Sequence, residues 1–314
     1  MRWSLRACVR AAVIIRAASL VTACRLKKLP AKAYASAHLS SRFEHSLGGR
    51  RDACTAFVFW HIEATGGRSI ASLMSVYIRR RLMLCASTSR GDYIHHLQNR
   101  SWVERNRHLF AEHHLHKFGS GWLRTYQAVR PSYAALGCRL TIGTILREPV
   151  SLFRSWYRHF GGGRPMTILA AQQSDMLLWS WGGGQGINLS ATEVVGRVLR
   201  LARVAVRGLD WIGLNERWDE SIVLLLDALG LPLPPVSPHI STAAPLAADA
   251  ASGAHEALLR RLNAVSIEYY RDATALFEER VLARQRSDSR FESRVIAFRR
   301  LPRTHTLYGG FSGA

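Results

Sequence analysis

A short stretch near the start of the chain combines glycines, hydroxyl groups and an arginine in a pattern that binds anions. An apolar, β-rich run predicts a strand over residues 55–62, and a helix-forming segment follows over residues 69–81. Glycines between the two can adopt backbone angles closed to other residues, so their amides point at a ligand held at the helix N-terminus. The groups expected to contact that anion are Thr65, Gly66, Gly67, Arg68 and Ser69. The spacing differs from the G-x-x-x-x-G-K-[ST] loop that wraps nucleoside triphosphates.

A second segment places more anion-binding groups after a strand. Residues 138–146 form an apolar run that predicts a buried strand, and residues 147–160 predict a helix opened by a proline. Arg147 stands at the carboxyl end of that strand, where open parallel sheets bind their ligands. Ser155 follows two turns into the helix, so an arginine and a serine rise from one short segment.

These segments resemble the sulfotransferases that use 3'-phosphoadenosine 5'-phosphosulfate (PAPS), in particular the Golgi carbohydrate type that includes the heparan sulfate 2-O-sulfotransferases. Residues 63–69 (EATGGRS) are similar to the family's PKTGGTS loop, and residues 146–157 to its LRDPVxRxxSxY segment. Residues 213–226 resemble a third stretch, GLTExFxESLxLL. The family's loop lysine falls on Ala64, and its second threonine falls on Arg68.

The resemblance implies an α/β fold: a P-loop-like doubly wound sheet, mainly parallel and flanked by helices, as in the sulfotransferases. The first motif would hold the 5'-phosphosulfate of PAPS, while Arg147 and Ser155 would bind the 3'-phosphate. The reaction implied is transfer of the sulfuryl group to a hydroxyl of a carbohydrate acceptor, possibly an acidic one. No metal is implied, and the nucleotide product is adenosine 3',5'-bisphosphate.

Sulfuryl transfer needs a base for the acceptor's proton and positive charge at the leaving phosphate. Related sequences carry a histidine after an acid at the end of the strand between the two nucleotide motifs. On that match the base is His114 with Glu112 beside it, and His113 is the second candidate. We expect Arg68 to take over part of the lysine's task. A metal site built on His113 and His116 lacks a further ligand at suitable spacing.

Charge divides the chain into three parts. Residues 1–43 carry nine Lys or Arg and no acid, and residues 280–314 carry eight Arg against two acids. The rest holds only +6 of the net charge of +21, which suits a polyanionic nucleotide better than nucleic acid. We therefore expect a basic N-terminal targeting or anchor segment over 1–43, a sulfotransferase-like domain over 52–285 and a basic, poorly ordered tail over 286–314.

The first segment and the cysteines bear on location. Residues 11–23 are apolar but interrupted by Arg16, well short of the about 20 residues of a membrane span. The resemblance implies a Golgi membrane protein with a lumenal catalytic domain, anchored through this segment, while the arginine-rich, acid-free composition also suits an organelle transit peptide. Cys85 and Cys138 are able to pair in an oxidising lumen, but we expect buried thiols.

The remaining pattern predicts four more elements between residues 191 and 284. These are a helix over 191–206, a strand over 209–214, a helix over 216–229 and a long helix over 255–284. Four arginines at helical spacing either face an acidic substrate or form a solvated helix face. They are Arg197, Arg200, Arg203 and Arg207.

Two other functions stay open. One is a catalytically impaired relative on the same fold that binds the nucleotide or a glycan without turnover. Ala64, which replaces the family's loop lysine, leaves this function open. The other, a P-loop kinase, is disfavoured because the chain lacks the Gly-Lys-Ser/Thr sequence.

Overall fold

Strands and helices alternate through the part of the chain that the computed structural model describes, which is residues 55–62, 65–79, 84–87, 108–114, 121–160, 192–238 and 253–304. The strands are β1 (Thr55–His61), β2 (Leu84–Ser87), β3 (His108–His114), β4 (Arg139–Leu146), β5 (Trp211–Leu214), β6 (Ser237–Pro238) and β7 (Arg303–Thr304). The helices are α3 (Gly67–Arg79), α6 (Gly121–Ala135), α7 (Pro149–Phe160), α10 (Thr192–Arg207), α11 (Trp218–Leu229), α12 (Gly253–Leu262), α13 (Ala264–Ser287) and α14 (Phe291–Arg299). A 3-10 turn, η3 (Asn215–Arg217), precedes α11.

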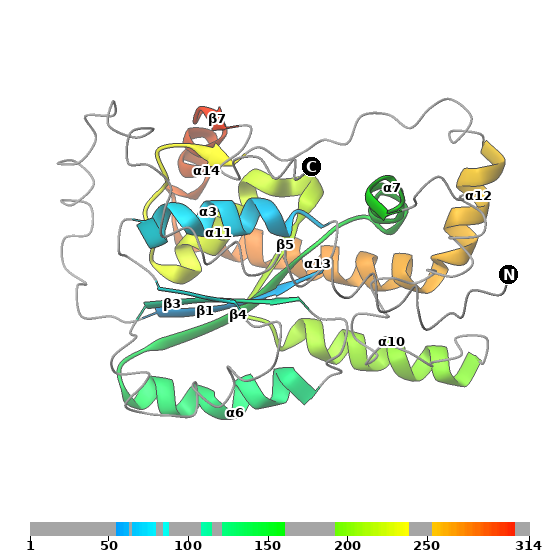
Figure 1. The fold of residues 1–314 in the computed structure, drawn as a ribbon, viewed down its shortest axis with the longest axis horizontal. Coiled ribbons are helices and arrows are strands. Elements are labelled where there is room, and N and C mark those ends of the chain that lie inside the picture. Colours follow the sequence, from blue (N-terminus) through cyan, green and yellow to red (C-terminus); the bar gives the residue numbers. More distant parts are fainter. Residues whose placement is uncertain are drawn as a thin grey trace, which may run out of the picture.

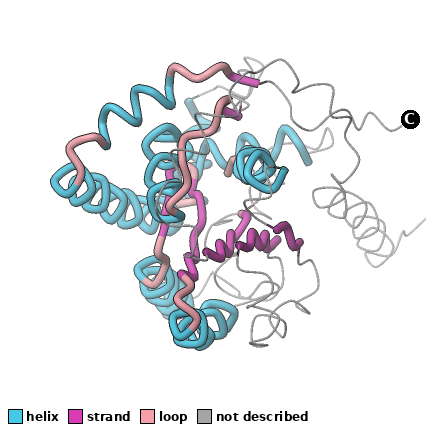
Figure 2. Tube along the Cα trace, turned by 90° about the vertical axis from the view of Figure 1, so that its left-hand side faces the viewer, coloured by secondary structure: helices cyan, strands magenta, loops and turns pink. Residues whose placement is uncertain are grey.

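The main sheet has five strands in the order β2-β3-β1-β4-β5, and every neighbouring pair is parallel. Helices α3 and α11 lie on one face, and α6 and α10 on the other (Figure 1). The turned view shows the same sandwich of strands between helices (Figure 2). The expected α/β fold with a mainly parallel sheet flanked by helices is thus confirmed. The strand order differs from the 3-2-1-4-5-6 and 2-1-3-4-5 orders of dinucleotide- and flavin-binding sheets.

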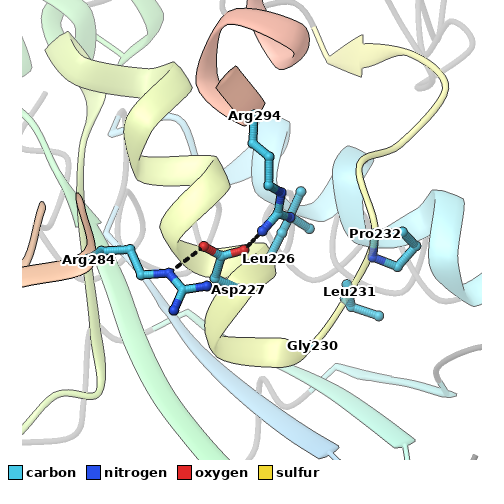
Figure 3. A pocket seen from close by; sticks show the side chains of 7 residues that line it. All are labelled: Leu226, Asp227, Gly230, Leu231, Pro232, Arg284 and Arg294. Atoms are coloured by element: carbon cyan, nitrogen blue, oxygen red, sulfur yellow. Dashed lines mark hydrogen bonds and ion pairs between the residues drawn. The ribbon is translucent and has the colours of Figure 1, made fainter. Parts of the chain in front are cut away.

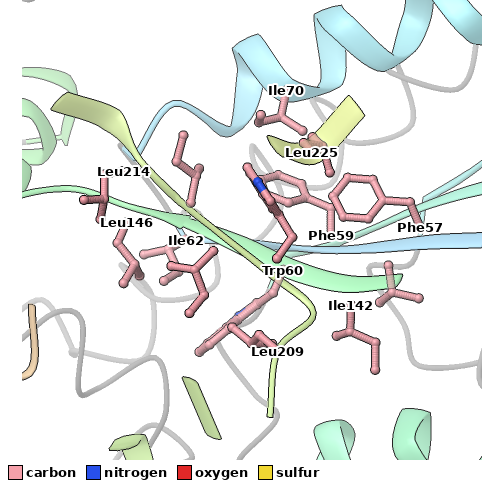
Figure 4. Packing of buried hydrophobic residues seen from close by; sticks show 14 of the residues in the cluster. Phe57, Phe59, Trp60, Ile62, Ile70, Ile142, Leu146, Leu209, Leu214 and Leu225 are labelled. Atoms are coloured by element: carbon pink, nitrogen blue, oxygen red, sulfur yellow. The ribbon is translucent and has the colours of Figure 1, made fainter. Parts of the chain in front are cut away.

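Both faces of β1 are buried, which explains its nearly unbroken apolar sequence. Phe57 and Phe59 lie on the face covered by α3, near Ile70, while Trp60 lies on the opposite face with Leu209 (Figure 4). The rings of Phe57 and Trp211 meet edge to face with centroids 6.0 Å apart. The central strand is therefore fixed from both sides.

The predicted strands and helices around the motifs are confirmed with small shifts at their ends. Helix α3 begins at Gly67, two residues before the expected start, because the Gly66 carbonyl accepts hydrogen bonds from the amides of Ser69 and Ile70 at 2.9 and 3.2 Å. Periodicity does not predict β2, which has only four residues and pairs along β3. A strand of that length is too short for an alternating pattern to stand out.

The long helix expected over residues 255–284 is instead two helices, α12 and α13, that meet at Asn263. The Asn263 side chain is buried, and its Nδ2 donates to the Leu259 carbonyl at 2.9 Å. Asparagine competes with the backbone for such bonds and so favours helix ends. The chain changes direction there, and α13 then packs along β5, α10 and α11 (Figure 1).

The expectation of a poorly ordered tail beyond residue 286 is wrong for residues up to Thr304. Helix α13 continues to Ser287, and α14 follows and buries Phe291, Val295 and Phe298 against the core. Strand β7 then pairs with β6. Apolar residues at spacings of three and four give α14 a buried stripe, which the basic composition of this region does not reveal.

A carboxylate joins the C-terminal helices to the sheet domain. Asp227 on α11 lies between Arg284 of α13 and Arg294 of α14, at the edge of a pocket of about 280 Å³ (Figure 3). The distance between Asp227 Oδ2 and Arg284 Nε is 2.9 Å. Arg284 also pairs with Asp288 at 2.9 Å, so the two arginines are balanced by two carboxylates and the pocket carries little unbalanced charge for a ligand.

Cys138, immediately before β4, is disulfide-bonded, so the expectation of a buried thiol is wrong for this residue. Cys85 does not fit as its partner. It lies on β2, three strand spacings from β4, or roughly 14 Å. That exceeds the about 7 Å over which two Cα atoms can be bridged. Among the described helices, none is both long and apolar enough to cross a membrane, and the expected anchor segment lies outside the described residues.

We predict that Cys138 is linked to Cys54. Thr55 pairs with Arg139 in the sheet, so the residue before each comes next in register. Mass spectrometry of a non-reduced digest should show a peptide joining Cys138 to Cys54 that disappears on reduction. Cys85→Ala serves as the matched control and should leave the linked peptide in place. A peptide joining Cys138 to any other cysteine would contradict the register argument.

Candidate anion-binding site

Strands β1 and β4 lie side by side, and their connections leave toward opposite edges of the sheet. The chain after β1 leads to β2 at one edge, and the chain after β4 leads to β5 at the other. Such a switch point opens a crevice at the carboxyl ends of the strands, where ligands of open α/β sheets bind. Both predicted anion-binding segments start here: the loop with Gly66 and Gly67 follows β1, and Arg147 follows β4.

The loop after β1 turns sharply through Gly66, whose φ of 99° other residues rarely adopt. Helix α3 starts at the next residue, so the first amides of the helix have no acceptor inside the helix. The first turn of α3 contains no acidic residue, and Arg68 is exposed there. The positive end of the helix dipole and the Arg68 guanidinium together favour an anion at this position.

Thr65, predicted as a ligand contact, is fully buried, and its hydroxyl donates to the Ile62 carbonyl at 2.8 Å. The hydroxyl therefore closes the loop from within. Ser69 is half-buried in the first turn of α3, and its amide donates to the Gly66 carbonyl. Gly67 is buried, whereas Gly66 is half-buried and Arg68 is exposed, so Gly66 and Arg68 are the predicted loop groups best placed to meet a ligand.

A residue of the third motif (residues 213–226) is hydrogen-bonded to the loop of the first motif (residues 63–69). Asn215 of η3 donates from Nδ2 to the Thr65 carbonyl at 2.9 Å. A Cβ on Gly66 would come within 2.6 Å of the same Nδ2 atom. Asn215 therefore fixes the loop and explains why position 66 has no side chain, a link that sequence spacing alone does not reveal.

A buried, hydrogen-bonded pair of polar side chains lies beneath the loop. His61, the last residue of β1, and Glu112 of β3 are buried, with 2.7 Å between Nδ1 and Oε1. Glu112 was expected to orient His114; its described contact is with His61, and its relation to His114 stays a prediction. Sequence reasoning missed His61 because a single histidine at the end of an apolar strand carries no motif. The signal that could have found it is a polar, titratable residue in an otherwise apolar, buried strand.

The two histidine candidates stand at the end of β3. The backbone of His113 pairs with Trp60 and that of His114 with His61, so both reach the carboxyl edge of the sheet beside the loop. Their side chains lie outside the described residues, as does His116. Their choice as base stays a prediction.

The segment after β4 is fixed by a chain of carboxylates. The Glu148 amide donates to Glu216 Oε1 at 2.9 Å, and the Tyr270 hydroxyl donates to Glu216 Oε2 at 2.6 Å. Burial, and then the bond to Glu216, raises the pKa of Tyr270, so its hydroxyl stays protonated as a donor. Glu148 Oε2 accepts from the Ser151 amide at 2.7 Å and so caps α7. This network sets the position of the backbone next to Arg147.

Arg147 is half-buried at the start of the segment and Ser155 is buried in α7. Their joint contact with a 3'-phosphate stays a prediction.

Arg217, in the third motif, forms a salt bridge with Glu220, and this contact raises the pKa of the Arg217 guanidinium. The same guanidinium lies over the Phe277 ring, 5.1 Å from its centroid. Arg217 is a structural residue.

One of the four arginines of α10 forms salt bridges to another helix of the fold. Arg203 binds Asp272 and Glu268 of α13, each at 2.6 Å, and these hydrogen bonds raise the pKa of its guanidinium. Arg203 therefore joins two helices. Arg200 and Arg207 are exposed on the same helix.

Two comparisons with known proteins gave no relative. No family model matches the chain, and no curated protein matches it. Within the described residues, no group of three or more His, Cys, Asp or Glu side chains is arranged to hold a metal ion.

We predict that Gly66→Ala destabilises the fold more than Gly137→Ala. Both glycines have positive φ, but a Cβ at Gly137 meets nothing within 4 Å, whereas one at Gly66 meets Asn215. The strain common to both substitutions costs about 1–2 kcal/mol, and overpacking adds about 1–3 kcal/mol at Gly66. Thermal unfolding measures the difference. Asn215→Ala in the Gly66→Ala background should recover part of the loss, and equal melting temperatures for the two single variants would refute the contact.

Proposed function

We propose that this chain is a PAPS-dependent sulfotransferase that transfers the sulfuryl group to a hydroxyl of a carbohydrate acceptor. One observation carries the proposal: three segments that resemble sulfotransferase motifs meet at one edge of the sheet. The loop of the first follows β1, Arg147 of the second follows the adjacent β4, and Asn215 of the third is bonded to the loop. Loops after parallel strands gather at one edge in any such sheet, so the support lies in the segments that gather there being the three that resemble the family's motifs, and in the bond from Asn215 to the loop.

The charges around the crevice support a ligand with phosphates at both ends. The amides of α3 and the exposed Arg68 suit a 5'-phosphosulfate, and Arg147 stands one strand away for the 3'-phosphate. Because neighbouring strands lie about 4.8 Å apart, the loop after β1 and Arg147 after β4 start close enough together for one nucleotide to reach both. PAPS, or its product adenosine 3',5'-bisphosphate, has this charge pattern.

The proposed reaction is a direct in-line transfer. The acceptor oxygen attacks sulfur, the bond from sulfur to the 5'-phosphate oxygen breaks, and His114 or His113 takes the hydroxyl proton. Negative charge grows on the departing phosphate, where the α3 amides and Arg68 stabilise it. Arg68 replaces only part of the lysine's role, since Arg and Lys place charge differently.

A second candidate is a binding protein on the same fold that holds the nucleotide or a glycan without turnover. Ala64 in place of the family's lysine favours it, because removing one transition-state charge contact costs about 3–4 kcal/mol. The two candidates agree on nucleotide binding and differ in whether labelled sulfate moves from PAPS to a glycan. A transfer assay across glycan acceptors separates them.

The disulfide at Cys138 supports a lumenal location. Disulfides persist in oxidising compartments such as the secretory pathway and are rare where thiols are kept reduced. We therefore place the proposed catalytic domain in the Golgi lumen, with residues 1–43 as the membrane anchor. A transit peptide into a reducing organelle is the alternative.

Replacing Arg147 with alanine should weaken binding of adenosine 3',5'-bisphosphate by about 10- to 150-fold. A buried, charge-assisted hydrogen bond contributes about 1.5–3 kcal/mol, which gives that range. Arg139, exposed at the other end of the same strand, is the matched control, and Arg139→Ala should leave the affinity unchanged. Calorimetry measures both, and equal affinities would remove Arg147 from the site.

His114→Ala should lower turnover by about 100-fold while leaving the affinity for adenosine 3',5'-bisphosphate nearly intact. A positioned base typically contributes 10²–10⁴-fold to rate. Transfer of radiolabelled sulfate gives turnover, and calorimetry gives affinity. If His113→Ala loses activity and His114→Ala keeps it, the base is the neighbouring residue.

A further inference from the structure

Helices α6 and α10 cover one face of the sheet, and the outer side of α10 combines aliphatic and basic side chains (Figure 1). Val204 is 71% exposed and Leu201 is 38% exposed, so two large hydrophobic side chains stand in solvent one turn apart. Arg200 and Arg207 are exposed on the same helix. Spacings of four and three place both arginines on the same side of the helix as Val204. We call these four residues the α10 face.

The two arginines of the α10 face are free to bind a negatively charged partner. Among the described residues, no acidic side chain pairs with Arg200 or Arg207. Arg203, which lies between them in sequence, is instead held by Glu268 and Asp272 of α13. The helix therefore uses one arginine to join the fold and leaves two in solvent.

Helix α6 extends this surface with uncharged residues. A Cβ on Gly208, which follows α10, would come within 2.8 Å of Gln127 Nε2, so the end of α10 touches α6. The partly exposed Arg130 of α6 is paired with Asp210. The exposed side chains that the structure describes on α6 are all uncharged and mostly small: Gln127, Ala128, Pro131, Ser132, Ala134 and Ala135. Two neighbouring helices thus present a continuous surface on which, within the described residues, every acid is paired.

The chemistry of this surface fits a phospholipid bilayer better than other partners. Arginine makes strong, paired hydrogen bonds to phosphate groups. Aliphatic side chains next to basic ones are typical of helices that lie in the membrane interface. An acidic glycan would pair with Arg200 and Arg207 but would leave Val204 in water. A second copy docked through the same face would bring like charges together.

The chain before the sheet supplies an independent reason. Residues 1–43 are the proposed membrane anchor, and residues 44–54 link them to β1. A linker of that length spans at most about 40 Å, so the domain stays close to the bilayer. Thr55 pairs with Arg139, which follows the end of α6 by four residues, so the chain enters the sheet near the last turn of α6. Because tethering raises the effective concentration, a weak contact is enough.

We propose that the α10 face and the outer surface of α6 rest on the membrane to which the N-terminal segment anchors the chain. Arg200 and Arg207 bind headgroup phosphates, while Leu201 and Val204 enter the interface. The crevice stays open, because it lies at the carboxyl edge of the sheet and not on the face that α6 and α10 cover. This inference rests on the anchoring part of the proposed function and not on nucleotide binding.

The test is photo-crosslinking of the full chain in vesicles that contain a photoactivatable phosphatidylcholine, followed by chymotryptic digestion and mass spectrometry. Lipid should be linked to the α10 peptide that contains Val204, and added phosphatidylserine should raise the yield. Ile296 on α14 is the internal control: it is 39% exposed, but α14 packs on α11, which covers the opposite face of the sheet (Figure 1). Its peptide should stay unlinked.

Variants test the arginines directly. In vesicles with phosphatidylserine, Arg200→Gln and Arg207→Gln should each lower the lipid linked to α10 by up to about fivefold, since one basic residue near an anionic surface contributes that much. Arg200→Lys and Arg207→Lys should keep most of the yield. Arg300→Gln, an exposed position at the end of α14, is the matched control and should change nothing. All three positions are exposed, and thermal unfolding checks that each variant is folded.

The outcomes separate this inference from the proposed function. If lipid is linked to the N-terminal segment but not to α10, the inference is overturned and the anchor stands. If the chain does not associate with the vesicles, the anchoring and the inference both fail. If photoactivatable heparin or a second copy of the chain is linked at the α10 peptide and lipid is not, the inference is overturned. A chain that is linked to lipid at α10 but binds no adenosine 3',5'-bisphosphate supports the inference and refutes the sulfotransferase function.

Discussion

The parallel pairing of β1 with both β3 and β4 is the constraint on which the rest of the structure depends. A strand in that position is buried on both faces, so its sequence is apolar and its ladder is complete. Because all neighbours run parallel, the loops that leave β1, β3 and β4 gather at one edge. The Thr-Gly-Gly loop, the histidines of β3 and Arg147 are brought together by this arrangement and not by nearness in sequence.

Polar contacts beneath the loop then set its shape. The Asn215 side chain donates a hydrogen bond to the Thr65 carbonyl, and the His61 ring packs against Gly67. Each glycine of the loop is thus matched to a particular neighbour as well as to a backbone angle. A loop held in this way is ordered before a ligand arrives, which reduces the entropy lost on binding.

The C-terminal helices support the segments around the candidate site, in part through a chain of hydrogen bonds. Tyr270 on α13 binds Glu216, which in turn accepts from the Glu148 amide beside Arg147. Asp227 holds α13 and α14 against α11 (Figure 3). Removing the helices after residue 253 would therefore disturb the crevice as well as the core.

The sequence by itself determined the α/β class and most elements, among them the strand and helix of each segment predicted to bind an anion, because burial of β1 and β4 and the helix start at the glycines are local patterns. It misjudged the region after residue 286, where α14 finds its apolar partner on α11. It also missed His61 and its bond to Glu112, which are 51 positions apart in sequence. Only the tertiary structure decided these points, since strand order fixes which distant residues become neighbours, and one strand pairing brings a histidine and a glutamate within hydrogen-bonding distance.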